Sequence, residues 1–345
     1  MQMKRRAIYL PYFISTESNN KYCSYMMDIL RISYEVTRLE KVSVNRDKIR
    51  ETDVIVLNWA EAYLDAELKR RILLYKLSGI KIIWVFHNKV PHDNDDSFAK
   101  KKMRWLAAIS DIIICHSHNS TVYLRNKSFI KKAVYIPHPA YMGKYDRFAP
   151  YKSQTFDETL RVGMFGLIRP YKNIDILIEI FSSDAYKDTE LYIAGMADSR
   201  YKAYTKGLTE WAKDYGNIHI ETQRLSDEDF YHYHMDVDIV VLPLDTSSSM
   251  NSGSLIKALS YGRPVIVSDI AMARDMADEP FIHMYHAEKT EHHIEGVKKQ
   301  LEYVRRLGKK ELHQEGEAAM EYMKKHNNTE EVLSALKQAI GKDNG

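Results

Sequence analysis

Residues 161–175 have the sequence RVGMFGLIRPYKNID, in which a short apolar run meets a glycine and a helical pattern follows. We predict a strand that ends just before Gly166, a tight turn at this glycine, and a helix from Asn173. Arg169 and Lys172 lie between the turn and the helix. Backbone N–H groups at a helix start, with two cations beside them, form a site for an anion such as a diphosphate. The structural alternative is a plain strand-to-helix turn with two solvated cations.

The same succession of strand and helix recurs along the chain and predicts an α/β fold. Several short runs are nearly all apolar, as expected of strands buried on both faces of a parallel sheet. Helical patterns such as Ala60–Leu77 and Asn173–Phe181 separate them, which is typical of layered α/β folds. The predicted strands are Ala7–Leu10, Asp53–Asn58, Lys81–Phe86, Asp111–Cys115, Ala133–Ile136, Leu160–Phe165, Glu190–Ala194, Asn217–Ile220, Asp238–Leu242 and Pro264–Ser268.

The length of 345 residues suits two domains, and the strand series restarts near Leu160. We interpret the polar segment Tyr141–Glu158 as the linker. The prediction is two Rossmann-like parallel-sheet domains facing a central cleft, residues 1–150 and 151–325. A C-terminal helix in 326–345 is expected to pack back toward the N-terminal domain. Ligands of such sheets bind beyond the carboxyl ends of the strands, so residues that follow strands are the functional candidates.

Composition excludes several classes of protein. Cys23 and Cys115 match no zinc or redox motif, which favours free thiols in a reducing, cytoplasmic compartment. The N-terminal apolar stretch is short and contains Pro11, so we interpret it as a strand and not as a signal peptide. No apolar run approaches the roughly 20 residues that a membrane span needs.

Charge is distributed unevenly. Residues 1–150 contain 26 lysines and arginines against 15 aspartates and glutamates, and the remainder contains 24 against 32. The segments Lys69–Lys76 and Lys100–Leu106 mix cations with Leu, Met and Trp, which suits an anionic membrane surface. A solvated helix face over a core stripe is the alternative. Nucleic acid is not expected as a partner, because no stacking platform or groove-reading motif is present.

A second segment, residues 242–267, has the sequence LPLDTSSSMNSGSLIKALSYGRPVIV. An apolar strand precedes a loop rich in serine and glycine, and a helix and another strand follow. Asn251 and the run Ser252–Ser254 lie where this helix begins. Their hydroxyl and amide groups can cap the helix or bind a phosphate.

In combination, these motifs resemble family 4 and related GT-B glycosyltransferases. The matches are spread in order from about Tyr9 to Val267. They are VFHNKVPH (85–92), ICHS (114–117), YIPH (135–138), FGLIRPYKN (165–173), LYIAG (191–195), DIVVLP (238–243) and SGSLIKALSYGRPVI (252–266).

The resemblance implies a nucleotide-diphosphate sugar donor and a saccharide or lipid-linked acceptor. Arg169 and Lys172 would bind the diphosphate, with backbone amides of Ser252–Ser254 against the same phosphates. Lys257 would lie close to the ribose or phosphates, and the turn Gln223–Arg224 would border the nucleobase. The donor-binding set is Gly166, Arg169, Lys172, Gln223, Arg224, Asn251, Ser252, Gly253, Ser254 and Lys257.

Sugar transfer requires stabilisation of the leaving diphosphate and a base for the acceptor hydroxyl. His87 follows a predicted strand and is the first candidate to orient the sugar or accept the proton. His92, Asp93 and Glu17 follow it in that order. A structural histidine is the alternative reading of His87.

No cofactor and no metal are expected. His87, His92, His116, His118 and His138 could converge in space, but they include no i, i+4 pair on a helix and no cysteine partner, so a metal site is not expected. The triplet 93–95, Asp-Asn-Asp, is interpreted as an acidic loop over the cleft.

The sequence departs from the family at the glutamate pair, in the loop Ser15–Lys21, which lacks the usual paired glycines, and at Leu167, where an arginine is usual. Alignment places Ser249 and Lys257 where most members have a pair of glutamates, so neither a retaining nor an inverting outcome is assigned. The main hypothesis is a glycosyltransferase of surface polysaccharide or glycolipid synthesis, peripheral at the inner face of the plasma membrane. A non-catalytic partner subunit or sugar-nucleotide-binding module is the alternative, and a nucleotide-sugar epimerase is the third hypothesis.

Overall fold

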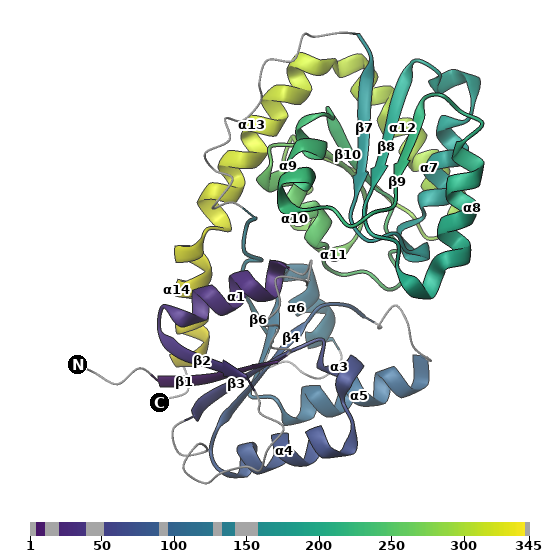
Figure 1. Cartoon of the computed structure of the whole chain (residues 1–345). Coiled ribbons are helices and arrows are strands. Elements are labelled where there is room, and N and C mark those ends of the chain that lie inside the picture. The colour runs from purple at the N-terminus through teal and green to yellow at the C-terminus, as the bar shows by residue number, and fades with distance from the viewer. Residues whose placement is uncertain are drawn as a thin grey trace. The chain divides into compact units, whose positions relative to one another are not determined.

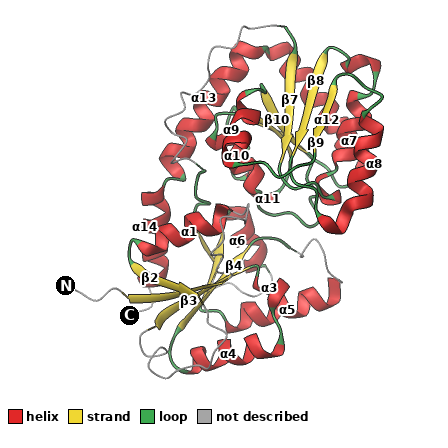
Figure 2. Cartoon of the chain, viewed as in Figure 1, coloured by secondary structure: helices red, strands yellow, loops and turns green. Residues whose placement is uncertain are grey.

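The computed structural model describes residues 5–10, 21–38, 52–89, 96–126, 133–141 and 158–341. The chain divides into two compact units, each built on one parallel sheet with helices packed against it (Figures 1 and 2). The N-terminal unit comprises Met1–Pro139 and Asn327–Gly345, and the C-terminal unit comprises Ala140–His326. Two six-stranded parallel sheets confirm the predicted pair of Rossmann-like folds.

The sheet of the N-terminal unit has the strand order β2-β1-β3-β4-β5-β6, and every pairing in it is parallel. Figure 1 shows α4 and α5 on one face and α1 and α14 on the other. The strands are β1 (Arg5–Leu10), β2 (Tyr34–Arg38), β3 (Thr52–Asn58), β4 (Lys81–Phe86), β5 (Ile112–Cys115) and β6 (Ala133–Tyr135). The helices are α1 (Lys21–Arg31), α3 (Ala60–Tyr63), α4 (Ala66–Leu77), α5 (Asp96–Ile109), α6 (His118–Arg125) and α14 (Thr329–Gly341).

The sheet of the C-terminal unit has the order β12-β11-β10-β7-β8-β9, again parallel throughout. Figure 1 shows α7, α8 and α12 on one face and α9, α10 and α13 on the other. The strands are β7 (Leu160–Phe165), β8 (Thr189–Ala194), β9 (Ile218–Glu221), β10 (Ile239–Leu242), β11 (Val265–Ser268) and β12 (Ile282–Tyr285). The helices are α7 (Ile174–Phe181), α8 (Lys202–Ala212), α9 (Asp227–Met235), α10 (Gly253–Ser260), α11 (Ala271–Arg274), α12 (Thr290–Leu307) and α13 (Lys309–His326), with short 3-10 turns η1 (Pro170–Lys172), η2 (Asp184–Tyr186) and η3 (Ser199–Tyr201).

Burial explains why the central strands were recognisable. In β4 and β5 nearly every side chain is buried, because helices cover both faces of the parallel sheet. All ten predicted strands are present within one or two residues of their predicted bounds. Two of the described strands were missed, β2 and β12; each forms one edge of its sheet, although the opposite edge strands, β6 and β9, were predicted. Edge strands pair on one side only and carry more polar residues, so their apolar signal is weaker.

The predicted helical segment Ala60–Leu77 consists of two helices, α3 and α4. The Asp65 carboxylate accepts a hydrogen bond from Leu68 N at 2.7 Å and caps α4 as a new helix. Residues 142–157 of the predicted linker lie outside the described residues.

The C-terminal helix α14 belongs to the core of the N-terminal unit. Val332, Leu336 and Ile340 recur every four residues and are buried with α1 and the sheet. No helix in the described ranges has both the length and the apolar character needed to cross a membrane.

Helices α10 and α13 approach closely where two glycines meet. A Cβ atom on Gly316, within α13, would lie 2.1 Å from the Gly262 carbonyl oxygen, and Gly262 itself has a φ of +67°. The glycine at 316 is therefore required by backbone contact and not by helix geometry.

We expect Gly316→Ala to lower the free energy of unfolding by about 1–3 kcal/mol, because the methyl group overpacks this contact. The matched control is Gly207→Ala in α8, where nothing lies within 4 Å of the added Cβ. This control should raise stability by about 0.5–1 kcal/mol, the ordinary preference of a helix for alanine. Thermal and urea unfolding measure both, and equal effects of the two substitutions would contradict the packing argument.

Candidate functional site

The carboxyl ends of β7 and β8 pass each other without room for a side chain. Gly166 follows β7 with a φ of +121°, and Gly195 follows β8. A Cβ atom on Gly195 would lie 1.9 Å from the Gly166 carbonyl oxygen, and Gly166 N donates to Ala194 O at 3.0 Å. This narrow edge leaves backbone exposed where a ligand can approach.

Lys172 extends over this edge from the turn η1. Its Nζ lies 2.8 Å from the position that a Cβ on Gly166 would occupy, and the residue is 5% exposed. Within the part of the chain that the structure describes, no acceptor is hydrogen-bonded to this ammonium group. Burial, together with the charges of Arg169 and Lys257, lowers the pKa of Lys172 to about 7. A buried cation without an acceptor is costly unless an anion completes the site.

The start of α10 lies against the same glycine. The Ser252 side chain caps the helix by accepting from Leu255 N at 3.2 Å. Ser254 Oγ donates to Phe165 O at 3.2 Å and lies 3.1 Å from the Cβ position of Gly166. The unsatisfied N–H groups of α10 therefore begin beside Lys172.

Two further predicted cations surround this point. Arg169 Nε donates to Asp198 Oδ2 at 2.9 Å. Lys257 Nζ lies 4.2 Å from the centre of the Phe230 ring and 5.2 Å from that of Tyr141, and its charge acts on Lys172. The structure thus brings the central members of the predicted set together.

Four members of the predicted set remain. Gln223 and Arg224 follow β9, where Gln223 N donates to Glu221 Oε1 at 3.0 Å. Asn251 is half-buried in the loop that leads into α10, and Gly253 begins the helix.

Sequence reasoning missed three acidic residues at the same edge of the sheet: Asp198, Asp245 and Asp269. Burial would raise the pKa of Asp245, but hydrogen bonds from Ser248 and Ser247 bring it below its usual value. Burial acts likewise on Asp269, and hydrogen bonds from His286 and Arg274 outweigh it. Asp245 and Asp269 follow β10 and β11 closely, so the rule of examining residues after strands would have found them.

In the N-terminal unit, three histidines follow three successive strands. His87, His116 and His138 come after β4, β5 and β6, and their neighbouring ring centres are 5.1–6.0 Å apart. Tyr22 lies among them and hydrogen-bonds His116 Nε2 at 2.7 Å. Because His116 Nδ1 donates to the Ile136 carbonyl oxygen, the tyrosine hydroxyl is the donor in this bond.

Burial keeps these imidazoles neutral. It lowers the pKa of His116 to about 4 and that of His138 to about 3, and it places the pKa of His87 well below its usual value. His87 stacks on Trp59 with ring centres 4.1 Å apart and an angle of 9° between the planes. Trp59 has a left-handed backbone with a φ of 42°, which costs of the order of 1–2 kcal/mol. A neutral ring in a fixed plane suits orientation of a hydroxyl better than storage of a proton.

The other candidates of the N-terminal half are His118, which the structure describes, and three residues outside the described ranges. His118 stacks on Tyr135 at 3.9 Å between ring centres, away from the three-histidine cluster. His92, Asp93 and Glu17 lie outside the described residues. Among the described residues, no group of three or more histidine, cysteine or acidic side chains has the geometry of a metal site.

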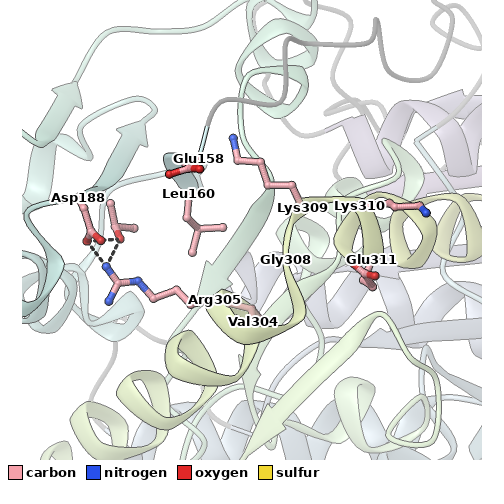
Figure 3. Close-up of a pocket in the computed structure, with 10 residues that line it drawn as sticks. Glu158, Leu160, Asp188, Val304, Arg305, Gly308, Lys309, Lys310 and Glu311 are labelled. Carbon is pink, nitrogen blue, oxygen red and sulfur yellow. Dashed lines mark hydrogen bonds and ion pairs between the residues drawn. The ribbon is translucent and has the colours of Figure 1, made fainter.

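A cavity of about 640 Å³ lies at the opposite end of the C-terminal sheet (Figure 3). It borders the amino ends of β7 and β8, at Leu160 and Thr189, and its charged groups include Asp188 paired with Arg305. Ligands of parallel sheets bind at the carboxyl ends, so this cavity is not the candidate site.

Proteins of similar sequence are glycosyltransferases, which agrees with a cation site suited to a diphosphate. Residues 159–300 match the family described as "Glycosyl transferases group 1". A GDP-mannose:glycolipid 4-beta-D-mannosyltransferase of Xanthomonas campestris pv. campestris is 26% identical over 276 residues, which are 76% of this chain and 73% of that protein.

Solved structures share the fold. Sucrose-phosphate synthase from Thermosynechococcus elongatus superposes with a TM-score of 0.70 at 13% identity, covering 99% of both chains. TarM gives a TM-score of 0.62 at 17% identity over 83% of this chain, which spans only 54% of the TarM chain.

The buried Lys172 predicts a gain in stability on its removal. Its folded pKa of about 7 lies below the ordinary 10.5, so the unfolded chain binds more protons between these values. The charged form of Lys172 therefore lowers the free energy of unfolding by its full amount below pH 7 and has no effect above pH 10.5. We expect Lys172→Met to raise the free energy of unfolding by at least ~1 kcal/mol at pH 6 and by little near pH 10.

Urea titrations at the two pH values measure this difference. Lys206→Met, at an exposed position of α8, is the control and should show no such pH dependence. A loss of stability at pH 6 in the Lys172 variant would contradict the buried, unneutralised charge.

Proposed function

We propose that this chain, a group 1 glycosyltransferase with the GT-B fold, transfers a hexose from a nucleotide-diphosphate sugar to a lipid-linked or saccharide acceptor. The observation that carries the proposal is the buried residue Lys172, whose ammonium group lies beside Gly166 and the start of α10 and has no hydrogen-bond acceptor among the described residues. Group 1 membership of residues 159–300 supports the reaction class.

Each part of the cation site has a role in the reaction. Arg169, Lys172 and Lys257 offset the charge of the diphosphate, which increases as the sugar leaves. The first N–H groups of α10 contribute fixed dipoles at the same place. Preorganised groups of this kind need no reorganisation during transfer. We propose that these charges of the chain serve in place of a metal or cofactor.

His87 is proposed to orient the reacting sugar or the acceptor hydroxyl. Its neutral imidazole can accept a hydrogen bond without first losing a proton. Stacking on Trp59 fixes its ring plane, which favours a single orientation of the bonded hydroxyl. At the acceptor we propose roles for His92 and Asp93. The nucleobase would be bordered by Gln223 and Arg224, and the phosphates would be contacted by Asn251.

The acceptor and the location are supported by the relative and by one surface. The Xanthomonas relative is named for a GDP-mannose donor and a glycolipid acceptor. In α4, Leu73, Leu74 and Leu77 are 41%, 39% and 83% exposed and share one helix face. Apolar side chains on an outward face favour a membrane surface.

Cations lie on the same helix and on α5. Lys69 Nζ lies 5.6 Å from the centre of the Trp105 ring and so links α4 to α5. Lys100, Lys101 and Arg104 of α5 are exposed. We propose that this leucine-and-lysine surface docks on the anionic inner face of the plasma membrane, with the enzyme on the cytoplasmic side.

A panel of nucleotide-diphosphate sugars, GDP-mannose included, tests the donor assignment. We expect at least one to raise the melting temperature by several degrees at saturation, because it binds only the folded protein. Lys172→Ala should remove most of this shift. Release of nucleoside diphosphate with an acceptor extract then separates an enzyme from a non-catalytic binding module, which would bind without turnover. If no sugar nucleotide binds, the proposal is wrong.

Sedimentation with vesicles rich in phosphatidylglycerol tests the membrane surface. Leu73→Ser combined with Leu77→Ser should reduce binding, and so should Lys100→Ala combined with Lys101→Ala, the latter mainly at low salt. Matched controls are Val122→Ser, at a half-exposed apolar position of α6, and Lys298→Ala with Lys299→Ala on the exposed face of α12. Equal binding by patch and control variants would dispose of this surface.

A further inference from the structure

We propose that Asp198 is a positioning residue that aims the guanidinium group of Arg169 at the donor phosphates. The inference rests on the proposed function and adds to it a residue from a different loop. Asp198 follows β8, whereas Arg169 follows β7.

Backbone pairing brings the two residues together. Beyond the ends of β7 and β8, Ile168 and Ala197 form one more parallel bridge, and Ile168 N donates to Met196 O at 3.0 Å. Arg169 and Asp198 are the next residues on the two strands. Their proximity is therefore fixed by the register of the sheet.

The carboxylate of Asp198 is itself held rigidly. Asp198 is 8% exposed and caps the turn η3, accepting from Arg200 N at 3.0 Å. The Arg200 side chain adds two hydrogen bonds, from Nε to Oδ1 at 3.0 Å and from Nη2 to Oδ2 at 2.6 Å. The hydrogen bond from Arg200 is the main cause that lowers the pKa of Asp198, so the group is ionised at neutral pH.

The carboxylate engages only one edge of Arg169. Nε donates to Oδ2 at 2.9 Å, and no acceptor is assigned to the two terminal amino groups in the described ranges. A guanidinium has five donors in a fixed plane, so a bond at Nε sets the direction of the remaining four. Arg169 and Lys172 flank one turn, since Lys172 N donates to Arg169 O at 3.1 Å, and the charge of Arg169 lowers the pKa of Lys172.

The alternative is that Asp198 competes with the donor phosphates for Arg169. A carboxylate beside a cation could withhold Arg169 from the phosphates, and its removal would then strengthen binding. The two ideas predict opposite signs for one substitution, which makes the pair decidable.

The test is calorimetric titration with GDP and UDP, and with guanosine and uridine, which lack phosphates. We expect Asp198→Asn to weaken binding of the nucleoside diphosphate about ten- to a hundredfold, the usual effect of losing a charged hydrogen bond. Nucleoside binding should not change. In an Arg169→Ala background, Asp198→Asn should not weaken diphosphate binding further. With Arg169 intact, Asp198→Glu should keep part of the diphosphate affinity that Asp198→Asn loses.

The matched control is Asp188→Asn. Asp188 also pairs with an arginine, Arg305, but lies before β8 at the opposite end of the sheet (Figure 3). Its substitution should leave diphosphate binding unchanged.

Three results would overturn the inference: tighter diphosphate binding by Asp198→Asn, unchanged binding, or an equal loss for diphosphate and nucleoside. The last would show a structural role, and the melting temperature would fall with it. If the unmodified protein binds neither GDP nor UDP, the proposed function itself fails, and the inference falls with it.

Discussion

The arrangement of the C-terminal unit depends on one constraint: Lys172 is buried, and no residue in the described ranges supplies an acceptor for its ammonium group. Lys172 Nζ lies 2.8 Å from the position of a Cβ on Gly166, so a side chain at position 166 would push the ammonium group aside. Gly195 is needed in turn because β8 passes the Gly166 carbonyl oxygen closely. The two glycines and the lysine therefore form a single device, and substitution of either glycine would displace the cation.

The buried charge of Lys172 lowers the stability of the fold but is what would bind an anion. Burial lowers the pKa of Lys172, and two neighbouring cations act in the same direction. The fold is thus less stable than it would be with an apolar side chain at this position. Arg169 differs, because Asp198 offsets part of its charge and fixes its direction. Lys172 is available to bind an anion, whereas Arg169 is bound to a carboxylate. A diphosphate carries enough negative charge to bind both.

The sequence predicted the architecture because burial leaves a strong mark on central strands. Runs such as KIIWVF in β4 and IIIC in β5 are apolar on both faces, and only a covered parallel sheet has this pattern. The turn after β7 was equally legible, since Gly166, Arg169 and Lys172 follow the strand directly. The division of Ala60–Leu77 at Asp65 was not, because a capping aspartate inside a helical pattern looks like any surface residue.

The role inferred for Asp198 was hidden for another reason. It lies 29 positions after Arg169, and only the extra bridge between Ile168 and Ala197 makes them neighbours. Register of this kind depends on how far two strands remain paired, which no local pattern reveals. The histidines show the same limit, since spacing placed each at a strand end but not in a common cluster with Tyr22. Burial lowers the pKa of the histidines in one unit and of Lys172 in the other, but the resulting charge states differ. It makes the imidazoles permanently neutral, whereas Lys172, starting from a higher pKa, stays within reach of the charged form that an anion requires.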